Sequence, residues 1–115
     1  MSTKIYYNPQ CSKCRQTLQL LNENGEDADI VEYLKTPPDE NTLREILTQL
    51  GIQPRQLMRS KETLYTELNL ADDSLSDEQL IQAMIKNPKL IERPIVVKDG
   101  KVAIGRPPEN ILTIL

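Results

Sequence analysis

Residues 4–21 have the sequence KIYYNPQCSKCRQTLQLL, and this segment predicts a strand, a turn and a helix in succession. The Asn-Pro-Gln sequence at residues 8–10 is a turn signal that ends the strand. From Ser12 the apolar residues recur at helical spacing, and Gly25 is a typical helix stop. Residues 30–34 then form a second predicted strand. The default arrangement of such a unit is two parallel strands joined by a right-handed crossover through the helix.

The middle of the chain, residues 36–88, is predicted to be helical. Thr36 is the expected N-cap of the first of these helices, with Pro37 at its first position. Two short helices are expected next. Ser76 and Gln79 then form a capping-box pattern at the start of another, longer helix.

The last third of the chain returns to strands. Residues 95–97 and 102–104 are rich in Val and Ile, and they flank an Asp-Gly pair at residues 99–100. Such a pair between two strand-like runs is a strong hairpin signal. The two prolines at residues 107–108 are expected to open a final helix.

The bulk properties fit one domain and argue against several classes of protein. A chain of 115 residues is long enough for one domain and too short for two. The element order, β-α-β, a helical insertion at about 36–88, then β-β-α, predicts a single α/β domain over residues 1–115. A formal net charge of −3 argues against a general nucleic-acid binder. Apolar runs fall short of the roughly 18 residues of a membrane span, and no signal peptide is apparent, so we expect a cytoplasmic protein without membrane contact.

Cys11 and Cys14 are the chain's two cysteines, and the sequence has no histidine. Two cysteines three positions apart cannot staple a fold together, and in a cytoplasmic chain they are typical of redox or catalytic chemistry. They also fall short of the about four Cys and His ligands of a structural zinc site. We therefore expect no metal.

Cys11 immediately precedes the predicted helix, where unpaired backbone N–H groups and the helix dipole favour an anion. A thiolate is stabilised in such a setting, and Lys13 and Arg15 add positive charge in the first turn. The same N–H groups could also bind an oxyanion. Cys11 is thus the candidate nucleophile, with a buried inert cysteine as the alternative. Cys14 lies on the apolar helix face, where a packed thiol and a redox partner both remain open.

Three arginines, Arg59, Arg93 and Arg106, each lie in a break between predicted elements. Arginine binds oxyanions through a planar fork of donors, so these residues are candidates for an anion site. Taken alone, a single arginine of this kind is more often a solvated surface side chain.

Together these residues resemble the glutaredoxin-coupled arsenate reductases of the ArsC family, and the resemblance covers essentially the whole chain. Five landmarks occur in order at matching separations: YYNPQC (6–11), YLKTPP (33–38), LMRSKE (57–62), LIERPIVV (90–97) and GRPP (105–108). The resemblance implies a thioredoxin-like fold with a mixed four-stranded sheet and a helical insertion. It implies that Cys11 is the nucleophile and that the three arginines surround the oxyanion. It also implies a cis-proline at Pro94, beside the cysteine.

In the scheme that the resemblance implies, the Cys11 thiolate attacks arsenate, glutathione adds to the arsenic, and glutaredoxin resolves the mixed species to give arsenite. Glutathione is then a reducing co-substrate, and no cofactor is bound. Two features depart from well-known members: Tyr7 stands where some carry a histidine, and Cys11 and Cys14 form a C-x-x-C motif. That motif resembles the related Spx-type regulators, which bind RNA polymerase, although the GRPP ending matches the reductases.

Two other functions therefore stay open. One is a redox-sensing regulator of the Spx type. The other is a thiol–disulfide oxidoreductase that uses Cys11 and Cys14. The arginine set favours the reductase, because three arginines around a thiol suit an oxyanion better than a neutral disulfide.

Overall fold

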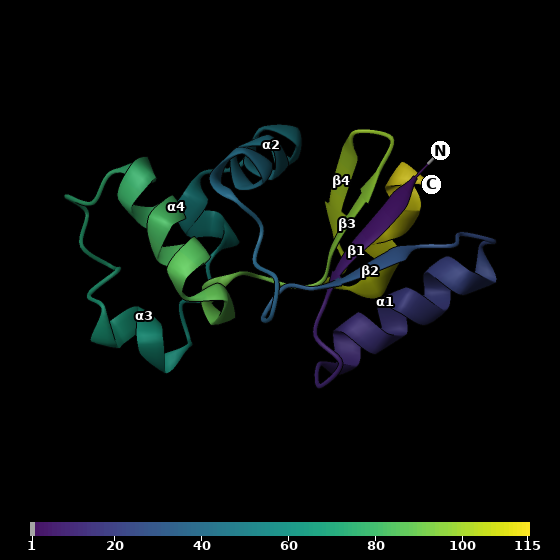
Figure 1. Cartoon of the computed structure of the whole chain (residues 1–115), viewed down its shortest axis with the longest axis horizontal. Coiled ribbons are helices and arrows are strands. Elements are labelled where there is room, and N and C mark those ends of the chain that lie inside the picture. Colours follow the sequence, from purple (N-terminus) through teal and green to yellow (C-terminus); the bar gives the residue numbers. More distant parts are fainter. Residues whose placement is uncertain (1) are drawn as a thin grey trace. The chain divides into compact units, whose positions relative to one another are not determined.

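A computed structural model describes residues 2–115, and the chain divides in it into two compact units (Figure 1). One unit combines the residues up to Thr36 with Arg93–Leu115, and the other is Pro37–Glu92. The second unit corresponds to the helical insertion predicted at about 36–88. A single domain over residues 1–115 stays a prediction. Within the described residues, no helix is both long and apolar enough to cross a membrane.

The first unit is built on a mixed four-stranded sheet with the strand order β2-β1-β3-β4. Its elements are β1 (Thr3–Tyr7), α1 (Ser12–Glu23), β2 (Asp29–Glu32), β3 (Ile95–Lys98), β4 (Lys101–Ile104) and the 3-10 helix η3 (Pro108–Ile114). The strands β1 and β2 are parallel, whereas the pairs β1–β3 and β3–β4 are antiparallel. The connections explain this mixture, because a helical crossover joins the parallel pair and a tight hairpin joins β3 to β4. The predicted mixed four-stranded α/β sheet is confirmed.

The core of this unit lies between one face of the sheet and the helices α1 and η3. Ile5, Val96 and Ala103 are register partners on β1, β3 and β4, so their side chains point to the same face. They pack in one buried cluster with Leu21 of α1 and with Ile111 and Ile114 of η3. This cluster holds α1 against the sheet, and thereby fixes the position of the helix start relative to the strands.

The hairpin between β3 and β4 turns at Asp99 and Gly100, as predicted. Both residues have positive φ, 50° and 81°. Two left-handed residues in succession characterise the turn whose twist matches that of paired strands, and Asp-Gly is a favoured sequence for it.

The second unit is helical and has a core of its own. It contains α2 (Glu40–Leu50), η1 (Pro54–Leu57), α3 (Thr63–Glu67), α4 (Asp77–Lys86) and η2 (Pro88–Leu90). The helices α2 and α4 contact each other, and their buried residues are Leu43, Ile46, Leu47, Leu80, Ile81 and Met84. The predicted capping box is present, since Ser76 Oγ accepts from the Gln79 N–H and Gln79 Oε1 accepts from the Ser76 N–H.

The first helix of the insertion begins later than the sequence predicted. It starts at Glu40, and the N-cap is Asp39, whose carboxylate accepts a 2.8 Å hydrogen bond from the Thr42 N–H. The prediction of Thr36 as N-cap and Pro37 as first helical residue was therefore wrong. Both residues precede a proline, and the position before a proline is disfavoured in the helical region.

Two other predicted elements also differ from the structure. The second strand ends at Glu32 rather than at residue 34, because the Glu32 carbonyl accepts from the N–H groups of Lys35 and Thr36 and the chain turns there. The last helix is a 3-10 helix rather than an α-helix, and it begins at Pro108.

The corrected helix start makes a pH-dependent prediction. The backbone and side-chain hydrogen bonds of Thr42 lower the pKa of Asp39 below its ordinary value. The charged cap therefore contributes stability above the unfolded-state pKa, and this contribution is lost as the pH falls through the folded-state pKa. Asp39→Asn keeps a neutral acceptor, so its deficit in unfolding free energy should be present at pH 7 and shrink on acidification. Urea unfolding at several pH values measures it. Thr36→Ala is the control. A larger loss of unfolding free energy in that variant than in Asp39→Asn would support Thr36 as the N-cap.

Candidate active site

The turn between β1 and α1 places Cys11 at the helix start. Asn8 organises this turn: its carbonyl accepts from the Cys11 N–H at 3.0 Å, and its Oδ1 accepts from the Gln10 N–H at 3.0 Å. Cys11 is the N-cap, with extended backbone, and its carbonyl accepts the helical hydrogen bond from the Arg15 N–H at 3.1 Å. The sulfur-bearing residue thus stands where the amides at the start of α1 have no partner within the helix.

The sheet register explains why two of the predicted arginines meet Cys11. Tyr6, Ile95 and Ile104 are partners in one row across β1, β3 and β4. Because β3 is antiparallel to both neighbours, its beginning lies at the edge where β1 and β4 end. The segments carrying Cys11, Arg93 and Arg106 therefore all leave the sheet at that edge.

Arg106 contacts the Cys11 sulfur directly. Its Nη2 donates to Cys11 Sγ at 3.6 Å, and its Nε donates to the Arg93 carbonyl at 2.7 Å. The guanidinium is thus held at both ends, with one donor directed at the thiol. Arg93 acts on the same sulfur through its positive charge. The peptide bond between Arg93 and Pro94 is cis, as predicted, and the Arg106–Pro107 bond is also cis, which was not predicted.

Cys11 is largely buried, with 8% of its surface exposed, and its surroundings favour the thiolate. Burial raises the pKa of its thiol. The N–H and thiol of Cys14, the charge of Arg93 and the N–H of Lys13 oppose burial, and the net result is a Cys11 pKa below its ordinary value. This direction agrees with the stabilised thiolate that the sequence predicts at Cys11.

Cys14 has the opposite environment. It is fully buried in α1, and burial together with the neighbouring Cys11 raises the pKa of its thiol to about 12. It therefore stays protonated near neutral pH, and donates toward the Cys11 sulfur rather than competing with it as a nucleophile.

The supporting cations predicted in the first turn act less directly. Lys13 acts on the sulfur through its backbone N–H. The side chain of Arg15 is exposed and donates to the Pro9 carbonyl at 2.9 Å, so it supports the turn that carries Cys11.

Arg59 belongs to the helical unit, where its backbone is tightly held. Its N–H donates to the Leu90 carbonyl at 2.7 Å, and its guanidinium pairs with Glu62 at 3.2 Å. Its place at the thiol stays a prediction.

Sequence reasoning missed two residues at the site, Thr17 and Gly105. Both are buried, and they contact each other although α1 and the end of β4 are distant in sequence. The available signal was a polar, β-branched residue on the buried face of α1, together with a glycine directly before Arg106.

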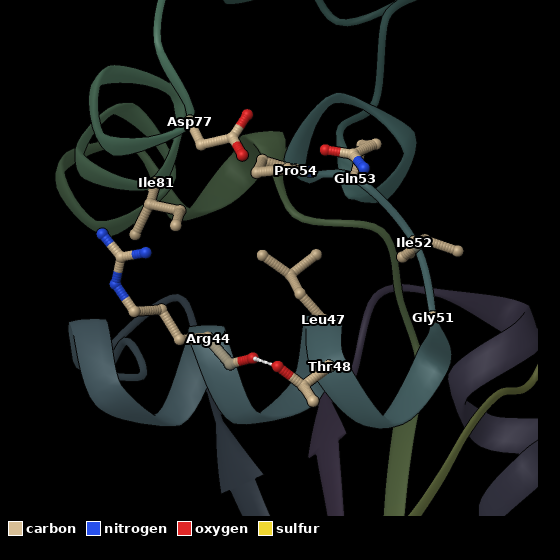
Figure 2. A pocket seen from close by; sticks show the side chains of 9 residues that line it. All are labelled: Arg44, Leu47, Thr48, Gly51, Ile52, Gln53, Pro54, Asp77 and Ile81. Atoms are coloured by element: carbon tan, nitrogen blue, oxygen red, sulfur yellow. Dashed lines mark hydrogen bonds between the residues drawn. The ribbon is translucent and has the colours of Figure 1, made fainter.

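A separate depression lies in the helical unit, between the end of α2, η1 and the start of α4 (Figure 2). Its volume is about 280 Å³, and Leu47 and Ile81 give it an apolar part. Its polar groups include Thr48, whose hydroxyl donates to the Arg44 carbonyl at 2.8 Å, and Arg44, whose guanidinium pairs with carboxylates of α2 and α4. No cysteine lines this depression, so it offers no nucleophile for thiol chemistry.

The arrangement around Cys11 combines a thiolate, helix-start amides and guanidinium groups in one place. Such a set can bind a tetrahedral oxyanion and present a sulfur nucleophile to its central atom. Across residues 2–115, no group of three or more acidic or cysteine side chains is arranged to hold a metal ion.

Known proteins share this architecture. A model of the ArsC family matches residues 6–114. The chain belongs to the ArsC family. A family relative, the arsenate reductase of Neisseria meningitidis serogroup A (strain DSM 15465 / Z2491), is 48% identical over 113 residues, which cover 97% of each chain. An uncharacterized protein of Escherichia coli K12, YfgD, is 63% identical over 113 residues, which cover 97% of this chain and 95% of that one.

A solved structure extends the similarity to the fold. The arsenate reductase from Vibrio cholerae is 52% identical to this ArsC-family chain and superposes with a TM-score of 0.97, covering 100% of this chain and 98% of the other. The predicted family and the predicted thioredoxin-like fold are thereby confirmed.

The opposite environments of the two thiols predict that Cys11 ionises well below Cys14. Alkylation by iodoacetamide, followed against pH in Cys11→Ser and Cys14→Ser variants, reports each thiol separately. With only Cys11 present, the alkylation rate should reach half its maximum at a pH below the ordinary pKa of a thiol. With only Cys14 present, labelling should stay slow throughout the neutral range. Faster labelling of Cys14 at neutral pH would exchange the assigned roles.

Proposed function

We propose that this protein reduces arsenate, with the Cys11 thiolate as the nucleophile. The observation that carries the proposal is the 3.6 Å contact between Arg106 Nη2 and Cys11 Sγ at the start of α1. A cation beside a thiol of lowered pKa is expected where an anionic substrate must approach an anionic nucleophile. Relatives at 40–48% identity that carry the name arsenate reductase support the same conclusion.

Arginine recognises the substrate in this proposal. Arg93 and Arg106 supply planar donor forks beside the sulfur, and Arg59 is included as the third arginine implied by the family resemblance. The amides at the start of α1 donate to the same oxyanion. These donors also neutralise charge that would otherwise repel arsenate from the thiolate.

The chemistry consumes two electrons at arsenic. The Cys11 sulfur forms a bond to arsenic, and one arsenate oxygen leaves as water after protonation. Glutathione then adds to the arsenic through its own sulfur and releases a second water. When the glutaredoxin thiolate attacks the glutathione sulfur, the sulfur–arsenic electron pair stays on arsenic, which becomes As(III). Hydrolysis frees arsenite and returns Cys11 as a thiol.

Glutathione and glutaredoxin therefore supply the reducing equivalents, and no bound cofactor takes part. A steady supply of reduced thiols is characteristic of the cytoplasm, and we place the reaction there. Cys14 has no required role in this scheme, because glutathione provides the second thiol.

A coupled assay tests the proposal. Arsenate-dependent oxidation of NADPH is followed with glutathione, glutaredoxin and glutathione reductase supplied. Cys11→Ser should abolish turnover, because no other thiolate stands at the helix start. Cys14→Ser should keep most of it, because a serine hydroxyl can still donate toward the Cys11 sulfur.

The assay also separates the alternative functions. A Cys14→Ser variant that reacts once with arsenate and then stops would identify an internal dithiol reductase, in which Cys14 supplies the second thiol. A wild type that reduces small disulfides but not arsenate would be a thiol–disulfide oxidoreductase. A wild type that turns over neither substrate, but forms a reversible Cys11–Cys14 disulfide, would fit a redox-sensing regulator.

Replacing each of the three arginines with alanine should weaken oxyanion binding. A charge-assisted hydrogen bond in a partly buried site is worth about 1.5–3 kcal/mol, so the dissociation constant should rise by roughly 10- to 150-fold. Calorimetric titration of the Cys11→Ser variant with arsenate measures binding without turnover. Arg44→Ala is the matched control, because its guanidinium pairs with Glu40 and Glu78 within the helical unit. An arginine whose loss has no more effect than Arg44→Ala does not belong to the site.

A further inference from the structure

We infer that Gly105 and Thr17 are positioning residues, which hold the guanidinium of Arg106 against the Cys11 sulfur. The inference rests on the proposed roles of Cys11 and Arg106. It assigns a task to two residues that do not touch the reacting atoms: they set the distance between the nucleophile and its cation.

Arg106 is held at two points. Its Nε donates to the Arg93 carbonyl at 2.7 Å, and its Nη2 reaches Cys11 Sγ at 3.6 Å. The second contact is long enough that a small displacement of the main chain would weaken it appreciably, since hydrogen bonds lose strength quickly with distance. The position of the backbone at residue 106 therefore decides whether the guanidinium reaches the Cys11 sulfur.

Gly105 fixes the backbone directly before Arg106. It is buried, and its N–H donates to the Pro94 carbonyl at 2.9 Å. A Cβ at this position would lie 2.5 Å from Thr17 Oγ1, 3.0 Å from Thr17 Cγ2 and 2.9 Å from Pro94 Cγ. Glycine is needed here because there is no space for a side chain, and the close approach of two segments is a typical use of a strand-end glycine.

Thr17 supplies the opposite wall from within α1. It is fully buried, and its hydroxyl donates to the Gly105 carbonyl at 3.5 Å. A helical threonine commonly bonds a carbonyl of its own helix, so a hydroxyl directed at another element indicates a contact between the two. The helix that begins at the nucleophile thus also supports the segment that carries the cation.

A methyl group added at residue 105 must move this segment away from α1 and Pro94. Arg106 follows immediately in the chain, so the shift is transmitted to its guanidinium. Gly105→Ala should therefore destabilise the Cys11 thiolate although residue 105 does not contact the sulfur. Thr17→Ala removes two of the three close contacts, together with the hydroxyl. Adding Gly105→Ala to Thr17→Ala should therefore have a much smaller effect than adding it to the wild type.

The experiment measures the pKa of Cys11 by alkylation in a Cys14→Ser background, in which only one thiol remains. Gly105→Ala should raise this pKa by about one unit, the shift expected from weakening one charge-assisted hydrogen bond. The KM for arsenate should rise as well. Relative to Thr17→Ala alone, Gly105→Ala/Thr17→Ala should show little further rise in this pKa.

Gly100→Ala is the matched control. Gly100 has φ of +81° and no atom within 4 Å of the position of an added Cβ, so this variant strains the hairpin without crowding the site. It should lower the melting temperature and leave the pKa of Cys11 unchanged. A purely structural role for Gly105 predicts the same result for Gly105→Ala, and a folded Gly105→Ala protein with an unchanged pKa would overturn the inference.

A second pair of variants covers the case in which Gly105→Ala does not fold. Thr17→Val keeps the shape of the side chain but loses the hydroxyl, whereas Thr17→Ser keeps the hydroxyl. The valine variant should raise the Cys11 pKa and the serine variant should not, and equal values in both would contradict the inference. Because the pKa is measured without arsenate, this result is independent of whether the wild type reduces arsenate.

Discussion

The hydrogen bond between Arg106 and Cys11 joins residues that are 95 positions apart in the chain. A largely buried sulfur does not ionise readily by itself, because burial favours the neutral thiol. Amides at the start of α1, the Cys14 thiol and the charge of Arg93 reverse that preference. The site therefore depends on bringing Arg93, from before β3, and Arg106, from the end of β4, to a nucleophile at the end of β1.

The sheet satisfies this requirement through its register. Pairing of β3 with both β1 and β4 in antiparallel orientation places the end of β1, the start of β3 and the end of β4 at one edge. The apolar cluster between the sheet and α1 then holds the helix start at the same edge. Gly105 packs closely against Thr17 of α1 and against Pro94 at the same edge. Loss of core packing would therefore affect thiol chemistry as well as stability.

Two thiols one helical turn apart differ widely in acidity because only one reaches the helix start. Cys11 receives the amides and the arginines, whereas Cys14 is fully buried and has a pKa of about 12. This asymmetry suits a single nucleophile that is resolved by an external thiol. The two thiols of the C-x-x-C pair also lie within hydrogen-bonding reach of each other. The proposed reductase and a redox switch therefore differ in whether glutathione or Cys14 supplies the second thiol.

The sequence by itself determined the order of the elements, the hairpin at Asp99 and Gly100 and the prominence of Cys11, because each depends on local turn chemistry or on a motif of adjacent residues. The cis bond before Pro94 was predicted through the resemblance to the ArsC family. Local patterns misplaced the start of α2, where consecutive prolines delay the helix. Only the tertiary structure decided that Arg106 touches the sulfur, that Arg15 supports a turn, and that Gly105 meets Thr17. These contacts join segments remote in sequence, and their distances follow from the packing of the whole sheet unit, which no local pattern specifies.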